Sequence, residues 1–153
     1  MKTIISLLSI ICLTAITSVS FDINHEAAIQ SIAVIVNKGN PVTTLSASEV
    51  KLYYLRRIKK RWPEIDKNIR PADQKKQCEE RDAFYALLGL DDAQVEQYFI
   101  TKQLQNAERP PDKFATEAAL IDFVAEEIGA IGYIKASSAT PEVMAKVKVV
   151  FTR

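Results

Sequence analysis

One short run near the start of the sequence constrains the fold more than any other part. Residues Ile32 to Val36 are all apolar and mostly β-branched, which indicates a strand covered on both faces. The next residues, 37–42, are rich in Asn, Gly and Pro, which favour a turn. Ser46 and Glu49 have the spacing of a capping box, in which each side chain bonds a free N–H at a helix start. The run predicts a strand followed by a helix whose N-terminus can hold an anion, as in many α/β proteins.

The remainder of the chain continues this alternation of strands and helices. Gly89 and Gly129 are placed to end helices, Gly129 in a left-handed conformation, and the Pro-Pro pair within 107–114 predicts a loop. Together the elements predict a single three-layer α/β lobe, in which a central, mixed, mostly parallel sheet is flanked by helices. We expect helices over 46–58, 77–88 and 116–128, others capped by Asp91 (with Gln94) and Thr140, and strands or extended segments over 69–72, 130–134 and 147–151.

The first residues have the features of a secretory signal peptide. Lys2 precedes an apolar stretch over 4–19, and small residues up to Ser20 suit a cleavage site. The alternative is a transmembrane anchor, but the stretch is shorter than the roughly 20 residues that a spanning helix needs. We therefore expect a signal peptide over 1–20, cleaved near Ser20, a lead-in segment over 21–31 and one α/β domain over 32–153, located in a bacterial periplasm.

Composition excludes several classes of function. Without the signal peptide, the chain has equal numbers of cationic and anionic side chains, which argues against a general nucleic-acid binder. Only Cys78 remains, so no internal disulfide can form, while a homodimer linked through this thiol stays open. His25 is the sole histidine and lies in the lead-in segment, so a catalytic triad or a histidine-rich metal site is hard to build. We expect no enzyme activity, no cofactor and no metal.

Two stretches of the sequence resemble a known family. The first joins residues 33–37 (AVIVN), 40–42 (NPV) and 45–46 (LS), and the second is 129–134 (GAIGYI). They resemble the phosphate-transporter type of periplasmic solute-binding protein, whose members carry a strand like VAVVVNxxNPV before LS and a helix, and later GxIGYV. The likeness extends over about 32–134. The resemblance implies one lobe of a type II periplasmic binding protein, whereas the full architecture has two lobes that close on a ligand. It also implies an ABC transporter as partner.

The segment 69–85 carries the ligand residues that this resemblance implies. Large phosphate-binding members have an Arg and a DGSGT turn here, which hold the oxyanion, and shorter relatives have a sequence like IxPVNLPEGSPLREAFY. This chain keeps Arg81 but has Gln77-Cys78 in place of the Gly-Ser pair, followed by Glu79 and Glu80. Arg81 is the best candidate anion contact, because a guanidinium can bind an oxyanion bidentately. Its alternative is a solvated helix arginine, and the turn around it is weakened by the substitutions.

Four further residues complete the candidate ligand site. Thr43 and Thr44 precede the first helix and can donate to an anion there, or serve as ordinary turn hydroxyls. Tyr133 can line a cleft, or belong to the core. Cys78 occupies the weakened turn, or is a small buried apolar side chain.

A basic cluster follows the first predicted helix. Its cations precede Trp62, and the cluster predicts contact with an acidic patch on a partner protein or with an anionic membrane surface. The alternative is a solvated helix end, where cations interact favourably with the helix dipole. The basic cluster comprises Arg56, Arg57, Lys59, Lys60 and Arg61.

Two hypotheses of function follow from these features. The first is a secreted solute-binding-like protein that binds phosphate or a related oxyanion in connection with an ABC transporter. The second is a one-lobe periplasmic interaction module, which docks on a membrane sensor or an envelope assembly through the basic cluster and binds no small ligand.

Overall fold

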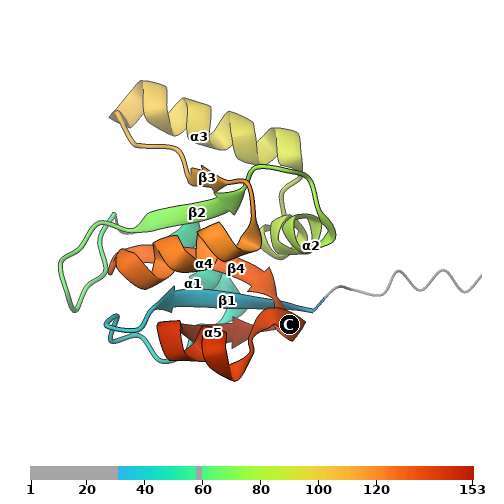
Figure 1. The fold of residues 1–153 in the computed structure, drawn as a ribbon. Coiled ribbons are helices and arrows are strands. Elements are labelled where there is room, and N and C mark those ends of the chain that lie inside the picture. Colours follow the sequence, from blue (N-terminus) through green and yellow to red (C-terminus); the bar gives the residue numbers. More distant parts are fainter. Residues whose placement is uncertain (1–30, 58–59) are drawn as a thin grey trace, which may run out of the picture.

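The computed structural model describes residues 31–57 and 60–153, which form a five-stranded sheet with helices on both faces (Figure 1). The predicted signal peptide and nearly all of the lead-in segment lie outside these residues. The strands are β1 (Ile32–Asn37), β2 (Arg70–Gln74), β3 (Asp112–Phe114), β4 (Ala130–Lys135) and β5 (Val147–Thr152). The helices are α1 (Ala47–Tyr54), α2 (Glu79–Leu88), α3 (Asp92–Asn106), α4 (Glu117–Glu126), the 3-10 turn η1 (Ala136–Ser138) and α5 (Pro141–Lys146).

The sheet is mixed, with the strand order β3-β2-β4-β1-β5. β2 pairs in parallel with both β3 and β4, whereas β1 pairs antiparallel with both β4 and β5. Among the described strands, β1 therefore runs against the direction that the others share. The prediction of a mixed, mostly parallel sheet in one α/β lobe is confirmed.

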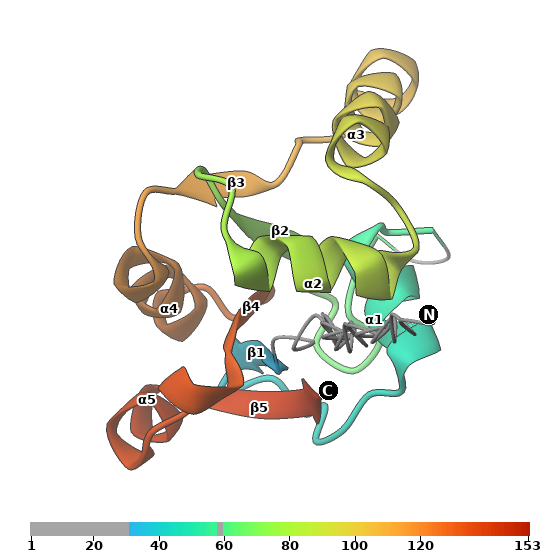
Figure 2. The same ribbon diagram turned by 90° about the vertical axis from the view of Figure 1, so that its right-hand side faces the viewer.

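Strand β1 shows why the opening run of the sequence is apolar throughout. Side chains alternate between the two faces of a strand, and here both faces are covered. Val34 packs into a core with α1, α2 and α3, whereas Ile35 packs into a second core with α4 and α5. Figure 2 shows α1 and α4 on opposite sides of β1 and β4. These two cores are the basis of the three-layer arrangement.

The predicted capping signals are present. The Ser46 hydroxyl accepts from the Glu49 backbone N–H at 3.3 Å, and the Glu49 carboxylate accepts from the Ser46 backbone N–H at 2.8 Å. Asp91 and Gln94 form the same reciprocal pair at the start of α3. Gly89 ends α2 in the left-handed region, at φ 69°. Each of these signals depends on residues only a few positions apart, which explains why it could be predicted.

The largest differences from the predicted elements lie after α1 and before α4. Helix α1 ends at Tyr54 rather than at residue 58, because Arg56 adopts a left-handed φ of 49°. The Arg57 N–H then bonds the Leu52 carbonyl at 3.0 Å, which closes a Schellman motif, an arrangement that usually places Gly where Arg56 lies. In addition, the predicted loop over 107–114 contains a short strand, β3, which extends the sheet beyond β2.

Gly129 does not have the predicted left-handed role. Helix α4 ends at Glu126, and Gly89 is the glycine with positive φ among the described residues. A Cβ at Gly129 would lie 2.1 Å from the Asn68 carbonyl oxygen, so the glycine is needed for the close approach of two backbone segments. The indole N–H of buried Trp62 also donates to the Gly129 carbonyl, at 2.9 Å. The contact fixes the chain before β2 against the start of β4.

Candidate functional site

A buried network of hydrogen bonds surrounds Asp73, near the carboxyl end of β2. Only 1% of Asp73 is exposed. The Tyr133 hydroxyl donates to Asp73 Oδ1 and the Tyr85 hydroxyl to Oδ2, each at 2.7 Å. Burial and the adjacent Asp73 carboxylate raise the pKa of both tyrosines, which keeps them as neutral donors. The network ties β4 and α2 to β2.

Arg81 belongs to the same network. Its Nε lies 3.7 Å from Asp73 Oδ1, its Nη2 lies 2.5 Å from Asp92 Oδ1, and its guanidinium lies 4.8 Å from the centre of the Tyr85 ring. Burial acts to lower the pKa of Arg81, but the contacts with Tyr85, Asp73 and Asp92 outweigh it and raise the pKa. The side chain is 5% exposed. Arg81 is thus held by internal carboxylates, rather than being a solvated helix arginine.

The first turn of α2 already holds a carboxylate. The N-cap residue, Cys78, makes no side-chain capping bond. The buried Glu80 carboxylate accepts from Gln74 Nε2 at 3.0 Å and lies 3.8 Å from Lys135 Nζ. Burial acts to raise the pKa of Glu80, but bonds from its own backbone N–H, from Gln74 and from Cys78, together with the charge of Lys135, lower it. The N-terminus of α2 therefore stabilises an anion, and that anion is Glu80.

The structure brings together only part of the predicted ligand site. Arg81, Cys78 and Tyr133 all lie around the last two residues of β2, with the Cys78 thiol 3.5 Å from Gln74 Oε1. Thr43 and Thr44 are exposed in the segment beside β5, where the following Leu45 N–H bonds the Val150 carbonyl. No hydrogen bond in the described part of the chain joins the two threonines to the other three residues.

Two important residues were missed in the sequence. Asp73 lies one position beyond the predicted strand 69–72, at the carboxyl end of a strand, where ligand-binding residues of α/β proteins commonly lie. Glu80 suits a helix N-terminus electrostatically, but the sequence does not show which residues it pairs with. Its partner Lys135 lies 55 positions further along the chain and could not be identified from local spacing.

The basic cluster is divided in the structure. The Arg56 side chain is only 9% exposed, and its Nε lies 3.7 Å from the buried Glu108 carboxylate. Lys60 is 61% exposed, and its Nζ lies 3.1 Å from Glu108. The exposed Arg61 pairs with Asp66 at 2.9 Å. Arg56 therefore has a structural role that the prediction did not assign.

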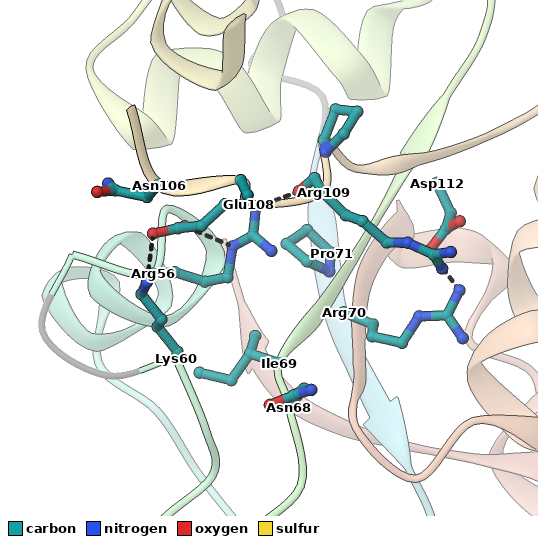
Figure 3. A pocket seen from close by; sticks show the side chains of 12 residues that line it. Arg56, Lys60, Asn68, Ile69, Arg70, Pro71, Asn106, Glu108, Arg109 and Asp112 are labelled. Atoms are coloured by element: carbon teal, nitrogen blue, oxygen red, sulfur yellow. Dashed lines mark hydrogen bonds and ion pairs between the residues drawn. The ribbon is translucent and has the colours of Figure 1, made fainter. Parts of the chain in front are cut away.

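Arg57 and Lys59 are the other two members of the basic cluster. The guanidinium of the exposed Arg57 lies 5.7 Å from the centre of the Tyr98 ring. Lys59 lies outside the described residues. The cluster borders a hollow of about 440 Å³ at the opposite end of β2 from Glu80 (Figure 3).

Within 31–57 and 60–153, no group of three or more His, Cys, Asp or Glu side chains has an arrangement suited to a metal ion. None of the described helices combines the length and apolar character that crossing a bilayer requires.

Comparisons with solved structures confirm the resemblance at the level of the fold. A protein of Clostridium perfringens assigned as a phosphate ABC transporter substrate-binding protein, solved with bound phosphate, matches 80% of this chain with 24% identity and a TM-score of 0.61. An ABC-type phosphate transport receptor from Vibrio cholerae matches 80% with 20% identity and a TM-score of 0.60. PstS from Borrelia burgdorferi matches 83% with 12% identity and a TM-score of 0.56.

The chain corresponds to only part of each of these proteins. It covers 45% of the Clostridium chain, 46% of the Vibrio chain and 52% of the Borrelia chain. No protein-family model matches the sequence, and no curated protein matches it significantly. The chain thus has the α/β fold of about half of a phosphate-transporter solute-binding protein.

Proposed function

We propose that this chain is a periplasmic, solute-binding-like protein that binds phosphate or a related oxyanion at the N-terminus of α2, in connection with an ABC transporter. Binding involves no chemical step in this proposal. The fold shared with a phosphate-bound protein supports it. Export would follow from a signal peptide cleaved near Ser20, and mass analysis of the exported protein would then find Phe21 at its N-terminus.

The observation that carries the proposal is the position of the Glu80 carboxylate. Free backbone N–H groups and the positive end of the helix dipole favour an anion at a helix N-terminus. Here Gln74 and Lys135 add a donor and a positive charge to that end of α2. An oxyanion that displaced the Glu80 side chain would find the same set of partners. Glu80 is, in this view, an internal competitor of the ligand.

The Asp73 network gives this end of the sheet a fixed geometry. Arg81 and Tyr133 are locked by hydrogen bonds and ion pairs to Asp73, so β2, β4 and α2 keep their relative positions. Lys135 is 42% exposed and can follow a ligand, whereas Arg81 is 5% exposed and cannot do so without releasing Asp73. We therefore assign direct contact with the ligand to the first turn of α2 and Lys135, and a positioning role to Arg81.

A calorimetric titration with phosphate, and then with sulfate, tests the proposal on three proteins. Glu80→Gln removes the competing charge and should strengthen phosphate binding by about tenfold or more. Glu79→Gln is the matched control, because Glu79 is exposed in the same helical turn and makes no ion pair with the described residues. Absence of phosphate binding by both the wild type and Glu80→Gln would disprove the proposal. An equal gain from Glu79→Gln would show a general charge effect.

The interaction module is the second candidate function. It is favoured by the finding that Glu80 and Arg81, at the expected ligand site, both have internal partners. The exposed cations Arg57 and Arg61 would then contact an acidic surface of a membrane sensor or envelope protein. Under this hypothesis, chemical cross-linking in cells should join the wild type to its partner protein. The double substitution Arg57→Glu and Arg61→Glu should abolish that cross-link. The same substitutions should leave any phosphate binding unchanged. A homodimer linked through Cys78 stays a prediction.

A further inference from the structure

The hollow beside Arg56 is a second candidate site, separate from the proposed oxyanion site. It lies where β2 begins, next to Arg70 and Pro71, whereas the Glu80 carboxylate contacts Gln74 at the other end of the same strand. Its volume of about 440 Å³ is within the range of roughly 300–1,000 Å³ that is usual for small-molecule sites. Figure 3 shows the side chains of Arg56 and Glu108 meeting at the hollow, whereas the side chain of Arg109 extends toward Arg70 and Asp112.

Two residues in an unfavourable backbone conformation shape the walls of this hollow. Arg56 closes the Schellman motif after α1 with φ 49°, and Ala107 ends α3 with φ 51°. Neither is Gly, so each pays a steric cost for the left-handed conformation. Ala107 lies directly before Glu108, at the point where the chain leaves α3. The Arg56 Nη2 donates to the Arg109 carbonyl. Backbone strain of this kind is common at functional sites.

The lining has more positive than negative charge. Arg70 is paired with Asp112 at 2.8 Å and with Glu127 at 2.7 Å. Glu108 is shared by Arg56 and Lys60. The guanidinium of exposed Arg109 makes no hydrogen bond or ion pair with the described part of the chain. An anion that entered the hollow would meet this available cation.

The buried polar atoms of the hollow lack hydrogen bonds. Arg56 Nε and both carboxylate oxygens of Glu108 are buried, and none of them has a hydrogen-bond partner within the described residues. The contacts of Glu108 with Arg56 at 3.7 Å and Lys60 at 3.1 Å are ion pairs without hydrogen-bond geometry. Leaving such groups unsatisfied is costly. A ligand that both accepts and donates hydrogen bonds would satisfy them.

We propose that this hollow binds a small hydroxylated organic anion. Its phosphate or carboxylate group contacts the guanidinium of Arg109, and its hydroxyls accept from Arg56 Nε and donate to Glu108. The apolar floor of Ile69 and Pro71 accommodates its carbon skeleton. A bare inorganic oxyanion would leave most of the volume unfilled, so the ligand has several carbon atoms. This site does not depend on the oxyanion site at α2, and either can exist without the other.

Titration calorimetry with glucose 6-phosphate and gluconate tests the proposal and distinguishes a phosphate from a carboxylate. Neutral glucose is the control ligand. We expect saturable binding of one or both anions, and no comparable binding of glucose. Arg109→Ala should weaken the binding about ten- to a hundredfold, because it removes a charge-assisted contact. Arg61→Ala is the matched control, since Arg61 is an exposed arginine that does not line the hollow.

Thermal unfolding checks the fold of each variant. Because Arg109 and Arg61 are both exposed, their removal should leave the fold intact. The proposal is overturned if neither anion binds the wild type, if glucose binds as tightly as the anions, or if Arg61→Ala weakens binding as much as Arg109→Ala. Failure here would leave phosphate binding by Glu80→Gln unaffected, because that variant changes the opposite end of β2.

Discussion

The Tyr133 hydroxyl donates to Asp73 Oδ1 at 2.7 Å, across two adjacent strands and 60 positions of sequence. Both side chains are almost completely buried. The carboxylate also accepts from Tyr85 and from the Gln74 N–H, and Arg81 lies beside it. A charge can be buried when it is paired and hydrogen-bonded in this way. The Asp73 carboxylate therefore joins β2 and β4 to α2 at the edge where we place the oxyanion site.

Tyr133→Phe should lower the free energy of unfolding by about 1–3 kcal/mol, because it leaves a buried carboxylate with one hydrogen bond fewer. Urea unfolding followed by circular dichroism measures the change. Tyr53→Phe is the matched control, since the Tyr53 hydroxyl makes no hydrogen bond in the described part of the chain while its ring stacks on Trp62. If the two variants lost equal stability, the bond to Asp73 would not be the cause.

Arg81→Ala should cost more, about 3–5 kcal/mol, because it leaves the buried Asp73 without its ion-pair partner. Loss of phosphate binding in this variant alone would thus not identify Arg81 as a ligand contact. Arg57→Ala is the control, since Arg57 is exposed, and it should change the free energy of unfolding by less than about 0.5 kcal/mol. A similar small effect of Arg81→Ala would contradict the structural role assigned to Arg81.

The parts of the fold that could be predicted depend on short-range patterns. The apolar run of β1 indicated burial on both faces, and the pairs Ser46–Glu49 and Asp91–Gln94 fixed two helix starts. The Asp73 network could not be predicted, because Tyr133 comes from a distant strand and nothing in its local sequence indicates its partner. Arg56 was unpredictable for another reason, since a left-handed helix end usually carries Gly.

The role of Gly129 could not be predicted either, because its contact, Asn68, is distant in the sequence. This contact gives a further prediction. Gly129→Ala should reduce the free energy of unfolding by about 1–3 kcal/mol or more, because the added Cβ would meet the Asn68 carbonyl at 2.1 Å. Gly39→Ala is the control, since its Cβ would meet side chains rather than backbone, Asn37 at 3.2 Å and Ile128 at 3.5 Å. Thermal unfolding of both variants gives the comparison. Equal melting temperatures would mean that the two backbone segments can separate at little cost.

The effect of Glu80 on stability should depend on pH in a defined direction. Burial acts to raise the pKa of Glu80, but its hydrogen bonds and Lys135 lower it below the ordinary value of 4.5. A carboxyl group whose pKa is lower in the folded state stabilises the fold when ionised. This contribution is complete above pH 4.5 and is lost as the pH falls through the lower, folded-state pKa.

The wild type should therefore be more stable than Glu80→Gln at pH 7, and this difference should shrink below pH 4.5. Urea unfolding of both proteins at a series of pH values measures it. Glu79→Gln serves as the control, because no comparable set of donors surrounds the exposed Glu79. A difference between wild type and Glu80→Gln that grew as the pH fell would mean that α2 does not stabilise the ionised carboxylate. The N-terminus of α2 would then be a poor site for an external oxyanion as well.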